Sequence, residues 1–138
     1  MTKKQRVLIL CTGNSARSQM AEGILRNIAG ERFDVESAGV DPTSVRNEAV
    51  VAMREIGIDI SSHRSKSVEE FVDQTFDYII TVCDNAKESC PVFSSDATRL
   101  HWSFPDPAAV TGTDLDRLDA FRNARDKIRE KLLEFAGR

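Results

Sequence analysis

Residues 7–18 read VLILCTGNSARS, a short apolar run followed at once by a loop of small and polar residues. An uninterrupted and partly β-branched run is typical of a strand inside a parallel sheet, where both faces are covered. After the loop, Met20, Ile24 and Ile28 recur at helical spacing. Gly30 follows them as a stop signal. This stretch therefore predicts a strand, a tight loop and a helix in direct succession.

The rest of the chain continues the alternation between strands and helices. Three further segments have strand character, and they are residues 33–38, 78–82 and 98–102. Apolar residues at helical spacing predict a helix that Gly57 closes and a short helical segment over residues 68–72. A long C-terminal helix follows, with Thr113 or Asp114 as its cap. Strands that alternate with helices imply right-handed crossovers and a parallel sheet covered by helices on both faces.

The composition fits a single domain that spans residues 1–138. A chain of this length buries about two-thirds of the surface that its unfolded form exposes. The 19 Lys and Arg residues nearly balance the 22 Asp and Glu residues, and the net charge of -3 gives no electrostatic reason to expect nucleic acid or a membrane as a partner. The first apolar run is too short for a signal peptide or a membrane span, so we expect a cytoplasmic protein, and a monomer.

The three cysteines are too few, and odd in number, for a secreted scaffold held together by disulfides. Their positions are more informative than their number. In parallel α/β sheets, ligands bind at the carboxyl ends of the strands. Cys11, Cys83 and Asp106 each follow a predicted strand closely. We therefore expect these three side chains to meet at one crevice.

The loop after the first strand has the features of an oxyanion cradle. A thiol, Cys11, and a guanidinium, Arg17, are separated by five residues that are small or tolerate unusual backbone angles. Successive N–H groups at the start of a helix can point inward at an anion, and the planar fork of Arg17 fits two oxygens of a tetrahedral anion. The residues predicted to bind the oxyanion are Thr12, Gly13, Asn14, Ser15, Ala16, Arg17 and Ser18.

The same surroundings predict a nucleophile at Cys11. Inward-pointing amides, the positive end of the helix and Arg17 all stabilise a thiolate, which is the reactive form of cysteine. Ser18 stands at the mouth of the helix, where its hydroxyl can donate a further hydrogen bond to the sulfur. The alternative is a buried structural cysteine at the end of a strand. The demanding sequence context favours a thiolate that attacks a bound oxyanion.

Asp106 is the predicted general acid. A thiolate that attacks an oxyanion must expel an oxygen, and expulsion is easier when an acid protonates the departing group. Asp106 stands between Pro105 and Pro107, on a loop expected to overhang the same crevice. The alternative is an ordinary Asp-Pro turn, which is common in proteins. The presence of the Cys11 loop favours the catalytic interpretation.

Cys83 and Cys90 follow the third clear strand. If the segment is helical, their Cα atoms lie about 10 Å apart along the axis. A disulfide needs roughly 4.4–6.8 Å, so the two thiols can join only if the segment unwinds or loops. The alternatives are two incidental buried thiols or a zinc site that includes His101. Zinc usually requires four ligands, which the chain does not offer at suitable spacing, and we expect no metal site.

Together these residues resemble a known family. The motif from Cys11 to Ser18, with Asp106 followed by Pro107 far downstream, resembles the low-molecular-weight protein tyrosine phosphatases and the arsenate reductases that share their fold. The added pair, Cys83 and Cys90, is similar to the thioredoxin-coupled arsenate reductases in particular. The resemblance runs over essentially the whole chain. It implies an α/β three-layer sandwich with a four-stranded parallel sheet flanked by helices.

The resemblance also implies a mechanism for arsenic detoxification. Cys11 would attack arsenate held by the loop and Arg17, with Asp106 protonating the leaving oxygen. Cys83 would then attack the sulfur of Cys11 and release arsenite, and Cys90 would attack Cys83 in turn. Thioredoxin, as the external reductant, would reduce the final disulfide, so that no bound cofactor is needed. Phosphate and sulfate would compete with arsenate as oxyanions.

Some relatives hold a potassium ion near the anion loop. The matching positions in this sequence are Asn14, Glu22 and Ser37, together with an aspartate whose place is taken here by Lys66. An ammonium group at that place can stand where the ion would be. We therefore expect no bound cation.

Two other functions compete with arsenate reduction. A low-molecular-weight protein tyrosine phosphatase needs Cys11, Arg17 and Asp106 but has no use for Cys83 and Cys90. A non-catalytic module that binds oxyanions or senses oxidation would need only the reactive thiol and its loop, and the candidate acid disfavours it.

Overall fold

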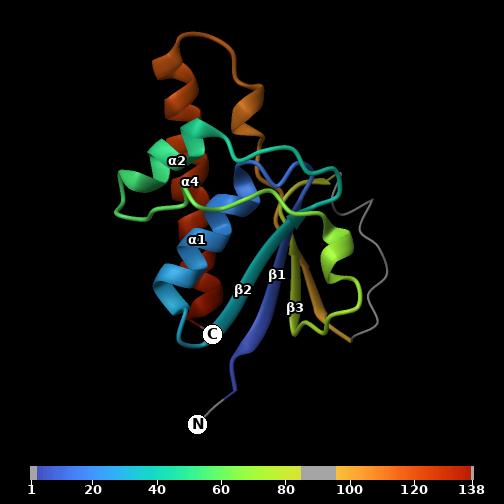
Figure 1. The fold of residues 1–138 in the computed structure, drawn as a ribbon. Coiled ribbons are helices and arrows are strands. Elements are labelled where there is room, and N and C mark those ends of the chain that lie inside the picture. The colour runs from blue at the N-terminus through green and yellow to red at the C-terminus, as the bar shows by residue number, and fades with distance from the viewer. Residues whose placement is uncertain (1–2, 85–95, 138) are drawn as a thin grey trace.

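The structure is a computed structural model, and it describes residues 3–84 and 96–137. Four strands form one sheet in the order β2-β1-β3-β4, and every neighbouring pair is parallel (Figure 1). The strands are β1 (Gln5–Cys11), β2 (Phe33–Gly39), β3 (Tyr78–Thr81) and β4 (Thr98–His101). The predicted α/β fold with a four-stranded parallel sheet is therefore confirmed.

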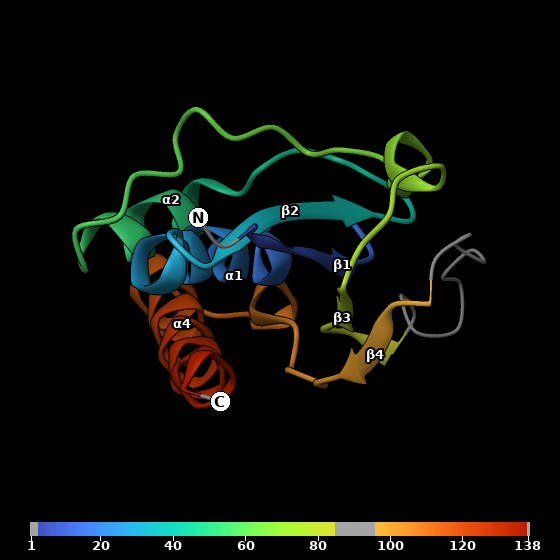
Figure 2. The ribbon, with the colours of Figure 1, turned by 90° about the horizontal axis from the view of Figure 1, so that it is seen from below.

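Three α-helices cover one side of this sheet. They are α1 (Arg17–Ala29), α2 (Asn47–Arg54) and α4 (Asp114–Ala136). Two short 3₁₀ helices complete the described elements, and they are η1 (Val68–Phe71) and η2 (Pro107–Ala109). Figures 1 and 2 show α1, α2 and α4 on one side of the sheet and η1 on the other. None of the helices in the described residues has the length and apolar character needed to cross a membrane.

The central strand β1 explains why the first apolar run is uninterrupted. Val7 and its three successors are fully buried, because β1 has a strand on each side and a covered surface above and below. The edge strand β2 instead alternates, with Phe33 and Val35 buried and Asp34 exposed. The sequence patterns of β1 and β2 thus match their central and edge places in the sheet.

Aromatic packing joins the end of α4 to the sheet. The ring of Phe135 lies 5.4 Å from that of Phe33, 5.1 Å from that of Tyr78 and 5.7 Å from that of Trp102, measured between centroids. Three of the four strand regions therefore contact one residue of the last helix. The helix is fixed at its start by Thr113, which forms a capping box with Asp116.

The loops after β1, β3 and β4 meet at the carboxyl ends of the strands. The amide of Val82 donates to the carbonyl of Leu10 at 2.9 Å, and the amide of Phe104 donates to the carbonyl of Val82 at 3.3 Å. Backbone pairing thus continues beyond the strand ends and ties the three loops together. The sequence predicted that Cys11, Cys83 and Asp106 would lie close together at these carboxyl ends.

Candidate active site

The loop after β1 turns its carbonyl groups away from its centre. The carbonyl of Thr12 accepts from the amide of Asp41 at 2.9 Å, that of Gly13 from Thr43 at 3.0 Å, and that of Ser15 from Arg46 at 2.8 Å. A segment that follows β2 therefore satisfies the outward-facing oxygens. The loop's own N–H groups are left to face inward, as an anion-binding nest requires. We call residues 11–18 the anion loop.

Asn14 produces the sharp turn of the anion loop. Its φ of 50° lies in the left-handed region, which asparagine tolerates better than most residues. The turn directs the Asn14 amide at the sulfur of Cys11, 3.2 Å away. The loop is thus wound around the thiol that ends β1.

Cys11 lies at the bottom of the loop and is only 2% exposed. Its Sγ is 2.8 Å from the Oγ of Ser18, in the first turn of α1, in addition to its contact with the amide of Asn14. Donors that point at a sulfur stabilise its thiolate form. The geometry suits the role of nucleophile that the sequence predicts for Cys11.

A cavity of about 190 Å³ opens in front of Cys11. Since a water molecule occupies about 30 Å³ in the liquid, the cavity has room for a small tetrahedral anion. Its lining consists of Cys11, Thr12, Gly13, Ser15, Ala16, Arg17, Thr43, Arg46, Asp106 and Ala108. Two arginines and residues of the anion loop thus line a space of the size that the predicted chemistry requires.

Arg17 joins the anion loop to the loop that carries the predicted acid. One guanidinium nitrogen donates to the carbonyl of Phe104 at 2.9 Å, and the other lies 3.9 Å from a carboxylate oxygen of Asp106. The Arg17 side chain is only 13% exposed. The guanidinium therefore sits at the cavity between both loops, where it can bind an oxyanion and orient the acid.

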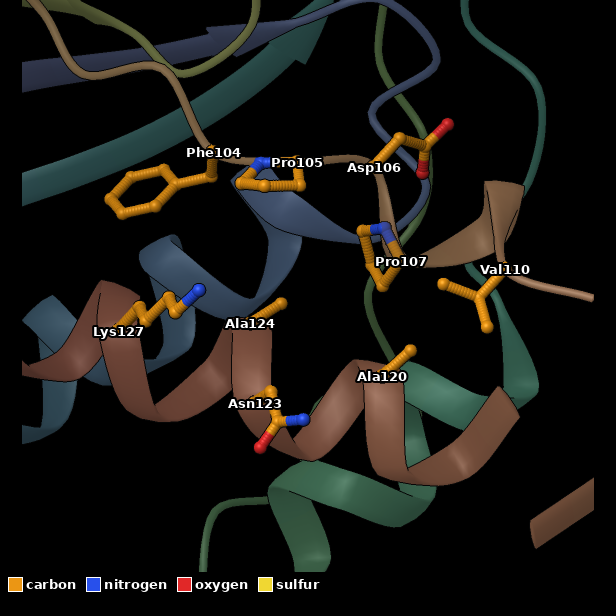
Figure 3. A pocket seen from close by; sticks show the side chains of 9 residues that line it. All are labelled: Phe104, Pro105, Asp106, Pro107, Val110, Ala120, Asn123, Ala124 and Lys127. Atoms are coloured by element: carbon orange, nitrogen blue, oxygen red, sulfur yellow. The ribbon is translucent and has the colours of Figure 1, made fainter. Parts of the chain in front are cut away.

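Asp106 faces the cavity because its prolines face away from it. Its Oδ1 accepts from the amide of Ala108 at 2.9 Å and so caps η2. Figure 3 shows Pro105 and Pro107 on the side of α4, with the carboxylate of Asp106 turned away from that helix. A second cavity, of about 180 Å³, lies between these prolines and α4. The Asp-Pro turn is real, but it also holds the carboxylate at the cavity in front of Cys11.

Cys83 lies beside the anion loop. Its Sγ is 3.3 Å from the Oγ1 of Thr12, and the residue is 5% exposed. The next residue, Asp84, contacts the Nε2 of His101 at 2.9 Å, while the Nδ1 of the same ring contacts the Oγ1 of Thr81 at 2.7 Å. These contacts hold the end of β3 against β4. Cys90 lies outside the described residues.

Asn14 and Ser18, both predicted to bind the oxyanion, are fully buried and do not line the cavity. The side-chain nitrogen of Asn14 donates to the Oγ of Ser18 at 2.8 Å and to that of Ser37 at 3.0 Å. Its oxygen accepts from Gln19 and from the backbone amide of Lys66, each at 2.9 Å. These two residues therefore shape the loop and contact the nucleophile from behind.

The sequence did not single out several residues of the site. Thr43 and Arg46 line the cavity, and both belong to the segment that follows the edge strand β2. Had the order of the strands been known, the rule that loops at carboxyl ends form the site would have pointed to them. His63 is a further residue without a predicted role, and its Nδ1 lies 2.9 Å from the Oε1 of Gln19 behind the anion loop.

Glu22 is a buried carboxylate behind the anion loop. Burial by itself raises the pKa of Glu22, but the hydrogen bond from Ser37 and the charges of Lys66, Arg26 and His63 outweigh it and lower the pKa below 4.5. Glu22 is therefore ionised at neutral pH. In residues 3–84 and 96–137, no cluster of three His, Cys, Asp or Glu side chains is placed to hold a metal ion.

Comparison with known proteins identifies the family. A model described as low molecular weight phosphotyrosine protein phosphatase matches residues 6–138. The chain belongs to this family. The family predicted from the anion loop and Asp106 is thus confirmed.

Within the phosphatase family, the chain is similar to proteins named arsenate reductase. One from Halalkalibacterium halodurans is 44% identical over 133 residues, which cover 96% of each chain. The solved structure of an arsenate reductase in the phosphate binding state matches this chain with a TM-score of 0.77 and 29% sequence identity. The match covers 96% of this chain and 97% of that chain. An arsenate reductase in the oxidized state has a TM-score of 0.81, 27% identity and the same coverage.

Phosphatases of the family have the same fold. The low molecular weight protein tyrosine phosphatase from T. tengcongensis has a TM-score of 0.77 and 27% identity, with 96% of this chain and 97% of that chain covered. The fold alone therefore does not separate the two activities, and the thiols must decide between them.

Proposed function

We propose that the chain reduces arsenate to arsenite through a relay of three thiols, Cys11, Cys83 and Cys90, with thioredoxin as the external reductant and no bound cofactor. The observation that carries the proposal is the position of Cys83. Its sulfur contacts Thr12 of the anion loop at 3.3 Å, so a second thiol stands beside the nucleophile's own loop. Phosphate transfer has no use for that thiol, whereas electron transfer requires it.

The first step is the attack of Cys11 on arsenic. The inward-facing amides and Arg17 hold arsenate in the cavity, with the Cys11 thiolate at its base. A sulfur–arsenic bond forms and an arsenic–oxygen bond breaks. The departing oxygen takes a proton from Asp106, which lines the same cavity, and leaves as water. Arsenic is still in its +5 state on the enzyme.

The second step is the reduction itself. The Cys83 thiolate attacks the sulfur of Cys11, so that a disulfide forms and the sulfur–arsenic bond breaks. The electron pair of that bond stays on arsenic, which leaves as arsenite in the +3 state. Two electrons have then passed from two thiols to arsenic, and the enzyme holds a disulfide between Cys11 and Cys83.

The last steps restore the thiols. The Cys90 thiolate attacks the sulfur of Cys83 and releases Cys11 as a thiolate. The dithiol of thioredoxin then attacks the disulfide between Cys83 and Cys90, becomes oxidised and returns both thiols. In a helix, a Cα separation of about 10 Å would prevent this disulfide, so the proposal requires a non-helical conformation between the two residues in the oxidised enzyme.

A phosphotyrosine phosphatase remains the second candidate, because Arg17 and Asp106 also suit phosphate transfer. The test supplies arsenate, thioredoxin, thioredoxin reductase and NADPH, and follows NADPH oxidation. The wild type is compared with Cys11→Ser, Cys83→Ser and Cys90→Ser, and p-nitrophenyl phosphate hydrolysis is measured in parallel. We expect arsenate-dependent turnover in the wild type alone.

Three outcomes would contradict the proposal. Full multiple turnover by Cys90→Ser would exclude the three-thiol relay. Hydrolysis of the phosphate ester without any arsenate-dependent loss of NADPH would identify a phosphatase. The absence of both activities, with phosphate still bound, would identify a binding or sensing module.

A further inference from the structure

A charged cluster lies behind the anion loop, away from the cavity. The ammonium of Lys66 is 3.3 Å from the Oε1 of Glu22 and 2.7 Å from the Oε2 of Glu36. The side chain of Glu22 is 4% exposed and that of Lys66 is 12% exposed. A carboxylate this deeply buried is stable only when it is paired and hydrogen-bonded. Lys66 is placed to provide that pairing.

Lys66 faces one particular oxygen of Glu22. Arg26 and His63 lie on the Oε2 side, at 2.9 and 3.4 Å. Burial is the main influence that lowers the pKa of His63 below 6.5, so this ring is mostly neutral at pH 7 and adds little charge. Among the described residues, Lys66 is the cation that contacts Oε1. Oε1 is also the oxygen that accepts the hydroxyl proton of Ser37, at 2.6 Å.

A chain of hydrogen bonds connects Glu22 to Cys11, and its donors point outward from Asn14 in both directions. Because an ionised carboxylate only accepts, Ser37 gives its single proton to Glu22 and must accept from Asn14, whose nitrogen is 3.0 Å away. The same nitrogen donates to Ser18 at 2.8 Å. The proton of Ser18 is then left to point at the sulfur of Cys11, 2.8 Å away.

The amide of Asn14 cannot easily turn over and reverse this order. Its oxygen accepts from the backbone amide of Lys66 at 2.9 Å, and a backbone N–H can only donate. Lys66 therefore acts twice on the same chain of hydrogen bonds. Its backbone fixes the orientation of Asn14, and its ammonium keeps Glu22 an acceptor.

The residues of the cluster do not fit a bound potassium ion. In a site of the kind that the family resemblance implies, the oxygens of Glu22 and Ser37 would be ligands of the metal. Here the Oε1 of Glu22 already contacts the ammonium of Lys66 and the hydroxyl of Ser37. A second carboxylate, Glu36, holds the ammonium in place. The charges of the two carboxylates are balanced by those of Lys66 and Arg26 without a metal.

We propose that Lys66 is a built-in cation and a positioning residue for Cys11, which makes the chain independent of potassium. Its ammonium keeps Glu22 in the acceptor state that orders Ser37, Asn14 and Ser18 toward the sulfur. The effect on arsenate turnover rests on the proposed function. The effects on anion binding and on the reactivity of Cys11 do not, and these are the ones to measure.

The test compares Lys66→Ala and Lys66→Met with Lys4→Met, a matched change at an exposed lysine. All are made in a Cys83→Ser, Cys90→Ser background, so that Cys11 is the reactive thiol. Two quantities are measured in potassium chloride and in choline chloride at equal ionic strength. They are the Kd of inorganic phosphate by calorimetry and the pH profile of Cys11 alkylation by iodoacetamide.

We expect the background protein and Lys4→Met to give the same values in both salts. In choline chloride, Lys66→Ala and Lys66→Met should bind phosphate at least about fivefold more weakly, because Glu22 loses a charged partner. Their alkylation profiles should move to higher pH. Potassium should restore the phosphate Kd and the alkylation profile of Lys66→Ala, which has room for an ion. It should not restore those of Lys66→Met, whose side chain fills the space.

Two results would overturn the inference. One is an unchanged phosphate Kd and alkylation profile in Lys66→Met, even if its thermal midpoint falls, because a purely structural role predicts that outcome. The other is a saturable effect of potassium on the phosphate Kd or the alkylation profile of the background protein, which retains Lys66. This second result requires no Lys66 variant, so it is informative even if the substituted chains fold poorly. If the wild type, with all three thiols, shows no arsenate-dependent turnover while these measurements come out as expected, the proposed function is refuted and the inference stands.

Discussion

At the scale of single residues, Asp106 and Arg17 show how one side chain positions another. Arg17 contacts both the carbonyl of Phe104 and, at 3.9 Å, the carboxylate of Asp106. An acid that lines the cavity and faces a guanidinium is oriented before the substrate arrives.

The variant Asp106→Asn should slow the first chemical step. The amide oxygen can still accept from Ala108 and cap η2, but the side chain no longer has a proton to give to the leaving oxygen. We expect the single-turnover rate with arsenate to fall by about 10²-fold or more, the usual contribution of a general acid. Quenched-flow measurement of arsenite release tests this. The Kd of phosphate serves as the control, and an unchanged turnover rate would remove Asp106 from the mechanism.

The sequence predicted the residues that the motif itself contains, and it did so because their chemistry is local. Cys11 and Arg17 are placed by one loop between one strand and one helix. Arg46 reaches the same cavity from the segment after β2, and only the strand order reveals that this segment lies beside the loop. The family resemblance likewise placed Lys66 and Glu22 at a possible cation site, but the second carboxylate that holds the ammonium, Glu36, required the structure.

At the scale of elements, the end of β2 is shaped to fit the anion loop. A Cβ on Gly39 would lie 2.5 Å from the carbonyl oxygen of Thr12 and 2.9 Å from the amide of Asn14. Both are backbone atoms, so neither can move without moving the loop. The glycine that ends β2 therefore allows the strand to approach the loop closely.

We expect Gly39→Ala to reduce both stability and anion binding. The added methyl group should destabilise the fold by about 1–3 kcal/mol, as overpacking does, and push the loop amides out of place. Gly57→Ala is the matched control, because Gly57 has a φ of 78° and nothing within 4 Å of the added carbon. It should cost about 1 kcal/mol and leave the Kd of phosphate unchanged. Urea unfolding measures the stability of both variants, and calorimetry measures their phosphate Kd. Equal phosphate affinity in the two variants would contradict the view that Gly39 lets β2 approach the anion loop closely.

Element types were predictable where the pattern is long and regular. The strand β1 and the helix α4 follow directly from an unbroken apolar run and from helical periodicity. The segment 68–72 was predicted as a short helix and is the 3₁₀ helix η1, capped by Ser67. Four residues contain too few repeats to distinguish an α-helix from a 3₁₀ helix.

At the scale of the whole molecule, net charge and site charge are separate properties. The chain carries a formal charge of -3, yet two arginines and residues of the anion loop line one cavity. Several charges of the chain form ion pairs outside this cavity, such as the one between Arg122 and Glu55 that joins α4 to the end of α2. Composition could therefore exclude a broadly basic surface but could not reveal the anion site.

The pH dependence of stability should show two separate windows. The pKa of His63 is lowered from 6.5, mainly by burial, and that of Glu22 is lowered from 4.5, because its hydrogen bond and cations outweigh burial. A group whose pKa is depressed in the folded state stabilises the fold above its unfolded pKa and loses that contribution as the pH falls through its folded value. His63 should therefore weaken the fold from about pH 6.5 downward, and Glu22 only below about pH 4.5.

Urea unfolding of the wild type, His63→Asn and Glu22→Gln between pH 7.5 and 3.5 tests both windows. Asparagine retains an N–H donor for Gln19 but does not titrate, so His63→Asn should lose less stability than the wild type between about pH 6.5 and 5. Glu22→Gln should start less stable at pH 7, because Lys66 keeps its charge without this partner, and should decline less below about pH 4.5. Equal slopes for His63→Asn and the wild type in the upper window would show that His63 titrates alike in the folded and unfolded chains. Burial behind the anion loop would then have no effect on it.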